Sequence, residues 1–224
     1  MLRVQPPQGD KILSHRVPAS WIQRIYVRTG GWREHAGVRV SATSSNESIE
    51  DKAIESVFAA LDVLRDTAPQ QLERIPILTL GLTIAPLDDA LGQWRSDLGV
   101  CLLNERFVVA RETTSPELAS TIVHELTHAR LEHVGFRSAD ATRARIERIC
   151  FLAQRNFVLS LPPSDERSRL EGIIAGYLAM DPEFWSDEQL AVRVRDRVAS
   201  WPFWHRALWN VGSIARAIVR RRAG

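Results

Sequence analysis

The sequence has little of several features that would assign it to a special class of protein. It contains two cysteines, Cys101 and Cys150, which are too few for the disulfide framework of a small secreted domain. We expect two reduced, buried thiols, with a single disulfide between them as the alternative. No run of about 18 apolar residues is present, so no transmembrane segment is predicted. The formal net charge of +2 is too small to indicate nucleic-acid binding.

What the chain does contain is typical of a globular protein. Hydrophobic residues make up 45% of the 224 residues and charged residues 25%, which are ordinary values for a folded domain. Residues 1–20 are polar and contain several prolines, and they lack the apolar segment of a signal peptide. We therefore expect an N-terminal tail over 1–20, one domain over 21–224, and a cytoplasmic location, with a piece of a larger protein as the alternative.

One short motif carries more chemistry than the rest of the chain. The sequence His124-Glu125-Leu126-Thr127-His128 is an H-E-x-x-H pattern. Because a helical residue advances by roughly 100°, the two histidines lie about 40° apart and one turn from each other. Neutral imidazoles in this arrangement can bind one metal ion, and zinc is the metal they suit best. Glu125 lies beside them, where a base for a zinc-bound water belongs.

The surrounding residues predict that this motif is helical. Thr114 and Glu117 have the spacing of a capping box, and Ser115 followed by Pro116 is an alternative start. Gly135 is suited to the C′ position after the last turn. The alternative interpretation is a solvated helix face that carries two histidines and a glutamate by chance.

Glu147 is the candidate for a third ligand. It follows His128 with 18 residues between, enough for one helix to end and a second to return. Its neighbours Ile146 and Ile149 predict a buried carboxylate, which needs a cation. Zinc would serve, and Arg143 one turn earlier is the alternative partner. Asp140 and Glu171 are the other acidic residues within reach in the sequence.

The motif, the HELTHA string and the Glu147 spacing resemble the gluzincin metallopeptidases, the thermolysin-like and related zinc proteases, over about residues 106–150. The resemblance implies a zincin-like α+β fold and zinc ligation by His124, His128 and Glu147. It also implies hydrolysis of a peptide or protein substrate by a metal-activated water, with Glu125 as general base. Two residues depart from the family pattern. Arg130 stands where an apolar residue is usual, and Phe151 stands where thermolysin-like enzymes have an aspartate.

The resemblance further implies a donor that stabilises the oxyanion. Tyr177 and His205 are the available tyrosine and histidine candidates, although no local motif marks either. His133 lies about half a turn from His124 around the helix and is not expected to bind the same metal. Glu132 is predicted to be a solvated charge, with a substrate contact as the alternative.

Hydrophobic periodicity gives the remaining elements of the predicted fold. Strands are expected at 21–28, 37–42, 76–86, 99–103 and 106–111, with a hairpin turn at Gly30-Gly31 and the 106–111 strand as a sheet edge that pairs with substrate. Helices are expected at 48–66, 113–135, 139–159, 164–180, 186–200 and from Pro202 onward. The fold is therefore α+β, with a small mixed sheet in a β-rich part (21–112) and a helical part (113–224).

Two alternatives to an active peptidase remain open. One is a zincin-fold protein without catalysis that acts as a sensor or binding module, which the Arg130 and Phe151 departures favour. The other is a helical interaction protein with a chance motif. Its last helix has an apolar stripe that includes Trp204 and ends in Arg220–Arg222, which suits either core packing or a membrane surface.

Overall fold

The computed structural model describes residues 31–43, 47–87, 90–136, 140–186, 188–189 and 192. The contacts between residues divide the chain into two compact parts, with the boundary between Met180 and Asp181. The first part combines a small five-stranded sheet, which lies in the N-terminal half of the chain, with a mostly helical remainder. The α and β content predicted from the sequence is thereby confirmed at this coarse level.

The elements of the first part follow one another in a mixed order. The strands are β1 (Arg33–His35), β2 (Val38–Ala42), β3 (Gly81–Ala85), β4 (Gly92–Arg95) and β5 (Val100–Asn104). The helices are α2 (Glu47–Thr67), α3 (Pro69–Leu78), α4 (Glu105–Val109), α5 (Ser115–His133), α6 (Asp140–Ser160) and α7 (Asp165–Leu178).

The sheet has the strand order β1-β2-β3-β5-β4. The three central strands, β2, β3 and β5, run parallel, whereas β1 and β4 are antiparallel to their neighbours and form the two edges. All five residues of β5 are buried, as expected for a strand covered on both faces. The predicted strands at 37–42 and 99–103 are confirmed, and each of their boundaries agrees with the structure to within one residue.

The hairpin turn lies later in the chain than the sequence predicted. Ala36 and Gly37 connect β1 to β2, and both have positive φ, 50° and 78°, as a two-residue turn of the primed type requires. Gly30-Gly31 was therefore the wrong choice for this turn. The predicted strand 21–28 lies outside the described residues.

The predicted strand at 76–86 is only half correct. Helix α3 continues through Pro76 to Leu78, and the strand begins at Gly81. Leu72 and Ile75 are buried in the core, so their packing sustains the helix although Pro76 lacks a backbone donor. The β-branched residues near Pro76 favoured a strand in the prediction, but tertiary packing overrides such propensity in short segments.

The predicted edge strand at 106–111 is wrong. These residues begin the short helix α4, whose N-cap is Asn104. The Asn104 side chain accepts a 3.1 Å hydrogen bond from the Arg106 N–H, and this cap starts a helical turn in spite of the two valines. The sheet edge nearest the motif is instead β4, which the sequence reading missed because it is short and has one buried residue, Trp94.

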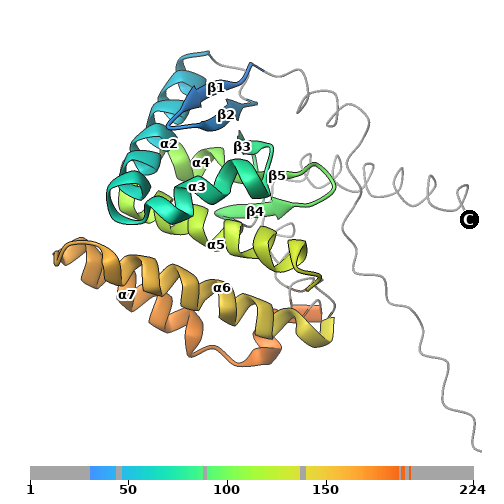
Figure 1. Ribbon diagram of the computed structural model, residues 1–224. Helices are drawn as coiled ribbons and strands as arrows, with labels where there is room; N and C mark the ends of the chain where they lie inside the picture. Colours follow the sequence, from blue (N-terminus) through green and yellow to red (C-terminus); the bar gives the residue numbers. More distant parts are fainter. Residues whose placement is uncertain are drawn as a thin grey trace, which may run out of the picture. The chain divides into compact units, whose positions relative to one another are not determined.

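Helix α5 packs against the sheet on one side and against α6 on the other, and α7 packs in turn on α6 (Figure 1). Leu118, Ile122 and Val123 are fully buried on α5. Helix α2, which the sequence predicted at 48–66, packs against α5 as well. The middle of the motif-bearing helix is therefore enclosed, whereas its first turn is partly exposed and its last turn reaches solvent.

The second part is described over a short segment. A 3-10 helix, η1 (Pro182–Trp185), precedes Ser186, whose hydroxyl accepts a hydrogen bond from the Gln189 N–H at 3.2 Å. This is the N-cap that the sequence predicted for the helix at 186–200. The predicted helix from Pro202 and the candidate His205 lie outside the described residues. Among the residues that the structure describes, no helix is long and apolar enough to cross a membrane.

Candidate metal centre

The helix that carries the motif is capped at both ends as predicted. The Thr114 hydroxyl accepts a hydrogen bond from the Glu117 N–H at 3.2 Å, so Thr114 rather than Ser115 is the N-cap. At the other end Gly135 has a φ of 90°, and the Phe136 N–H returns to the Leu131 carbonyl at 2.8 Å. This is the hydrogen bond of a Schellman motif. The caps fix the register of His124 and His128 on α5.

Helix α6 brings Glu147 to the two histidines. The Glu147 Oε2 atom lies 3.4 Å from His124 Nε2 and 3.5 Å from His128 Nε2. The two Nε2 atoms are 3.2 Å apart. All three side chains that the sequence assigned to the metal therefore converge on one point, although they come from two helices.

These three distances fit a tetrahedral metal ion. For bond lengths of about 2.0–2.1 Å, neighbouring ligand atoms around a tetrahedral zinc are about 3.3–3.4 Å apart. The observed separations of 3.2, 3.4 and 3.5 Å lie close to that value. The donor set of two imidazoles and a carboxylate is also one that zinc accepts.

The electrostatics of the cluster favour a cation. Burial acts to raise the pKa of Glu147, but hydrogen bonds from His124 and His128 outweigh it and hold the pKa well below its usual range. Burial acts to lower the pKa of His128, but hydrogen bonds with Cys150 and Glu147 outweigh it and raise the pKa above its usual value. A negative Glu147 thus attracts positive charge to the point between the imidazoles.

A glutamine fixes the orientation of His124. The His124 Nδ1 atom lies 3.2 Å from the Gln154 Oε1 atom, and the Gln154 amide donates to the Ser120 hydroxyl at 3.1 Å. Because the Gln154 amide nitrogen donates to Ser120, the Gln154 Oε1 atom faces His124 and accepts a hydrogen bond from Nδ1–H. The Nε2 atom of His124 then faces Glu147 and His128, where its lone pair would be available to a metal ion, which is how outer residues orient metal ligands. The sequence gave no signal for Gln154, since it depends on the packing of α6 on α5.

Aromatic rings fill the space beside His124. Phe151 meets the His124 ring edge-on at a centroid distance of 4.6 Å, and Tyr177 stacks on Phe151 at 4.7 Å. Phe151 thus packs directly against a proposed ligand at the place where thermolysin-like enzymes have an aspartate. The structure places the Tyr177 ring one aromatic layer away from His124.

Glu125 faces the edge strand rather than the two histidines. Its carboxylate Oε2 accepts a 2.7 Å hydrogen bond from the backbone N–H of Trp94 on β4. Gly92, two residues earlier on β4, leaves room for this side chain, because a Cβ atom there would lie 2.8 Å from the Glu125 Cγ. Glu125 is only 6% exposed. The candidate base is therefore held in place by the strand that borders the site.

Trp94 also connects this strand to the end of α5. Its indole Nε1–H donates to the Glu132 Oε2 at 2.7 Å. The structure thus places Glu132 against Trp94 rather than in solvent, and the residue supports the strand that holds Glu125. His133 is exposed in the last turn of α5.

Cys150 is a member of the cluster that the sequence reading did not assign to the site. Nitrogen atoms of His124 and His128 and the Cys150 Sγ atom all lie within 4.8 Å of one another, close enough to bind one metal ion. Cys150 is fully buried and, like Cys101, is not in a disulfide. A signal existed in the sequence, because Cys150 follows Glu147 by three residues and therefore shares its helix face.

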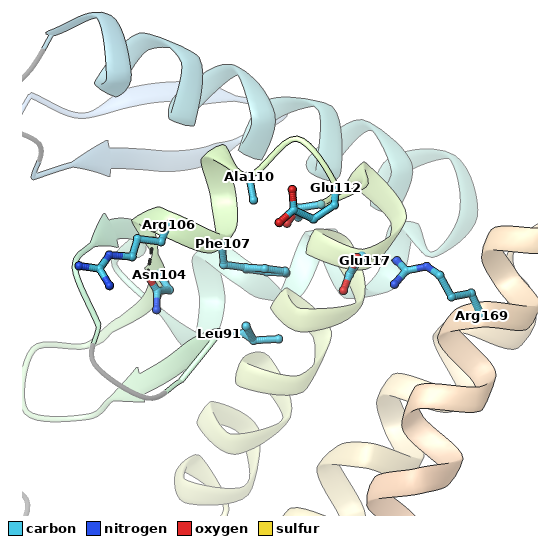
Figure 2. A pocket seen from close by; sticks show the side chains of 9 residues that line it. Leu91, Asn104, Arg106, Phe107, Ala110, Glu112, Glu117 and Arg169 are labelled. Carbon is cyan, nitrogen blue, oxygen red and sulfur yellow. Dashed lines mark hydrogen bonds and ion pairs between the residues drawn. The ribbon is translucent and has the colours of Figure 1, made fainter. Parts of the chain in front are cut away.

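A cavity of about 370 Å³ opens beside the first turn of α5. Phe107 points into it from α4, and Arg169 reaches from α7 toward Glu117 on α5 (Figure 2). Arg169 pairs with Glu117 at 2.5 Å and with Glu166 at 2.8 Å. Glu117 precedes His124 by seven residues, so the cavity lies on the histidine side of α5 and about 10 Å along the helix axis.

Comparison with known proteins does not add a relative to these observations. No protein-family model, curated protein or solved structure matches the chain. Any assignment of function to the cluster therefore depends on its residues and their geometry.

Proposed function

We propose that the chain is a zinc-dependent peptidase with a zincin-like fold, in which His124, His128 and Glu147 bind the metal and Glu125 is the general base. The observation that carries this proposal is the convergence of two imidazole nitrogens and one carboxylate oxygen at 3.2–3.5 Å from each other. A helix face with chance histidines would not bring the carboxylate of a second helix to that point.

The residues beside the metal position suit acid–base chemistry. When bound, the metal supplies a Lewis acid that polarises a carbonyl and activates a water. Glu125 uses Oε2 to accept the Trp94 hydrogen bond, and its second oxygen, Oε1, is the atom that would receive a proton. Burial of Glu125 keeps bulk water away from that proton. The carboxylate then returns the proton to the leaving amine, as a general base that becomes a general acid does.

The edge strand supplies a means of holding an extended substrate. The Leu91 carbonyl accepts from Asn104, and Gln93 lies opposite Leu102, so the backbone groups of Gly92 and Trp94 point away from β5. The Trp94 N–H already binds Glu125, so a peptide that adds to this edge would form hydrogen bonds with the remaining outward backbone groups beside Glu125. This assigns to β4 the role that the sequence reading gave to residues 106–111.

The cavity beside the first turn of α5 lies near the far end of the proposed substrate path along β4. Leu91, which lines the cavity, precedes Trp94 by three residues, or about 10 Å of extended chain. Glu117 is separated from His124 by a similar length of helix. A side chain of the substrate about three residues from the cleaved bond would therefore reach the cavity, which suits a peptide rather than a smaller amide.

Oxyanion stabilisation stays with the two candidates from the sequence. Tyr177 is joined to the site through Phe151, which contacts His124. His205 lies outside the described residues, so it stays a candidate predicted from the sequence.

A metal site without catalysis is the second candidate function, and Cys150 is the observation that favours it. Four protein donors close a zinc site, and closed sites are usually structural, whereas catalytic sites keep one open position. A sensor or binding module with a closed site would bind zinc and leave peptides intact.

The experiment that separates these functions combines metal analysis with peptide cleavage. Protein purified without chelator is expected to contain about one zinc per chain and to cleave members of a mixed peptide library, as read by mass spectrometry. Cleavage is expected to stop with chelator and to return with added zinc. A stoichiometric zinc content without cleavage would support the sensor, and absence of zinc uptake would reject both functions.

A further inference from the structure

The position of Cys150 is not explained by packing in the core alone. It lies on α6, three residues after Glu147, so both side chains project from the same face toward α5. The thiol is fully buried, and it lies within 4.8 Å of ring nitrogens of both His124 and His128. The Glu147 Oε2 atom lies 3.5 Å from His128 Nε2, so the thiol and the carboxylate lie beside the same imidazole.

The other cysteine provides the contrast. Cys101 is equally buried, but it belongs to β5, between β3 and β4 in the sheet, where a cysteine packs as a small apolar side chain. Cys150 has apolar neighbours too, Leu131 and Ile146, yet its remaining side faces the imidazoles. Cys101 belongs to no cluster of potential metal donors among the described residues, whereas Cys150 lies beside both imidazoles.

The cluster then offers four donor atoms instead of three. Two imidazole nitrogens and the Glu147 oxygen lie 3.2–3.5 Å from one another, and the Cys150 sulfur lies within 4.8 Å of both imidazoles. These four atoms are the number of donors that a tetrahedral zinc site requires. A zinc–sulfur bond is about 2.3 Å, longer than the bonds to nitrogen or oxygen. The sulfur therefore needs to approach the metal position less closely than the other three donors.

We propose that the Cys150 thiolate is the fourth metal donor in the resting protein and that an incoming ligand displaces it to open the site. This inference rests on the proposed metal centre and deepens it. The metals concerned are divalent ions that accept both sulfur and nitrogen, such as Zn²⁺ and Co²⁺. The resting protein is consequently latent, and a substrate or inhibitor must compete with the thiolate for the fourth position.

Cobalt substitution of the full-length protein tests the resting state. With one Co²⁺ bound, the parent is expected to show a near-ultraviolet thiolate-to-cobalt charge-transfer band. The band is expected to persist in Cys101→Ser, the matched buried cysteine, and to disappear in Cys150→Ser. A parent that binds one Co²⁺ without this band overturns the role of Cys150 while leaving the metal centre intact. A parent that binds no Co²⁺ overturns the proposed function as well.

Displacement of the thiolate is tested with acetohydroxamate, a bidentate chelating group. Titration into the cobalt-loaded parent is expected to remove the charge-transfer band as the ligand binds. Cys150→Ala is expected to bind the same ligand at least about tenfold more tightly, because no thiolate competes. Cys101→Ala is the control and is expected to bind like the parent. Binding that leaves the band intact, or equal affinity in parent and Cys150→Ala, would overturn the exchange.

Discussion

The backbone N–H of Trp94 donates a 2.7 Å hydrogen bond to the carboxylate of Glu125. The two residues are 31 positions apart, and the bond joins the outer edge of the sheet to the motif-bearing helix. It fixes the candidate base next to the strand that we assign to substrate binding.

Replacement of the proposed base by its amide separates binding from catalysis. Glu125→Gln is expected to keep the metal and the Trp94 hydrogen bond, because the amide oxygen still accepts a hydrogen bond from the Trp94 N–H. Peptide cleavage is expected to fall by about 100- to 10,000-fold, since the amide cannot take a proton from water. Zinc content and initial rates measure the two effects.

Glu132→Gln is the matched control for that variant. Glu132 lies on the same helix and also accepts a hydrogen bond from Trp94, but it is two turns from His124. Cleavage by this variant is expected to remain near that of the parent. If Glu125→Gln cleaves as fast as Glu132→Gln, another residue is the base.

A methyl group on the edge strand should displace the base without touching the metal. In Gly92→Ala the new Cβ would lie 2.8 Å from the Glu125 Cγ and 3.1 Å from its Oε1, so the flexible carboxylate must move. We expect cleavage to fall by at least about tenfold, because a base must remain within hydrogen-bond reach of its proton. Zinc content is expected to stay at the parent's value.

The control for steric displacement is Gly172→Ala on α7. A Cβ atom at Gly172 would meet nothing within 4 Å, and alanine is the better helix former by about 1 kcal/mol. This variant is expected to be as active as the parent and slightly more stable by thermal denaturation. Unchanged cleavage in Gly92→Ala would mean that the position of Glu125 is not important for turnover.

Removal of Gln154 should weaken the metal site from outside it. In Gln154→Ala the His124 Nδ1 loses its acceptor, so the ring is no longer held with Nε2 toward the metal. Loss of such an outer partner typically costs about 10- to 100-fold in metal affinity. Competition with a chromophoric chelator measures the change, and Arg155→Ala, an exposed neighbour on α6, is expected to bind zinc like the parent.

The third ligand is tested by comparing three carboxylates. Glu147→Ala is expected to lose more than about 100-fold in zinc affinity, a larger loss than outer residues produce. Glu171→Ala is expected to bind zinc normally, because the Glu171 carboxylate pairs with Arg167 at 2.7 Å. Asp140→Ala is expected to do the same, since Asp140 begins α6 about 10 Å along the axis from Glu147. Retention of zinc by Glu147→Ala together with its loss in either other variant would move the third ligand.

Acid should loosen the attachment of α7 to α5. Glu166 accepts hydrogen bonds from Arg169 and from the Thr114 hydroxyl, and these hold its pKa below the ordinary value. A carboxyl with a lowered folded-state pKa stabilises the fold above its unfolded-state pKa of about 4.3 and loses that contribution as pH falls through the folded-state pKa.

Glu166→Gln is therefore expected to unfold at a lower temperature than the parent near neutral pH. Because the pair is partly exposed, the difference in free energy of unfolding is expected to stay below about 1 kcal/mol. The difference should shrink as pH falls through the folded-state pKa. Thermal denaturation at several pH values measures it, and a difference that grows in acid would contradict the assignment.

Local chemistry is what the sequence by itself determined. The Thr114 cap, the end at Gly135 and the extents of α2, α5 and α6 follow from capping residues and apolar periodicity, which act within a few turns of one chain segment. The spacing of His124 and His128 is likewise a property of a single helix. These features needed no knowledge of what packs against them, and the sequence predicted them correctly.

Tertiary structure alone decided how the site is completed. Residues 106–109 carry two valines but form a helical turn because Asn104 caps it, and Pro76 lies in a helix because Leu72 and Ile75 are buried. Contacts of Trp94 with Glu125 and of Gln154 with His124 join segments at least 30 residues apart. No local pattern encodes such contacts, since they arise only when separate segments pack. The same packing brought Cys150 within 4.8 Å of the His124 and His128 ring nitrogens.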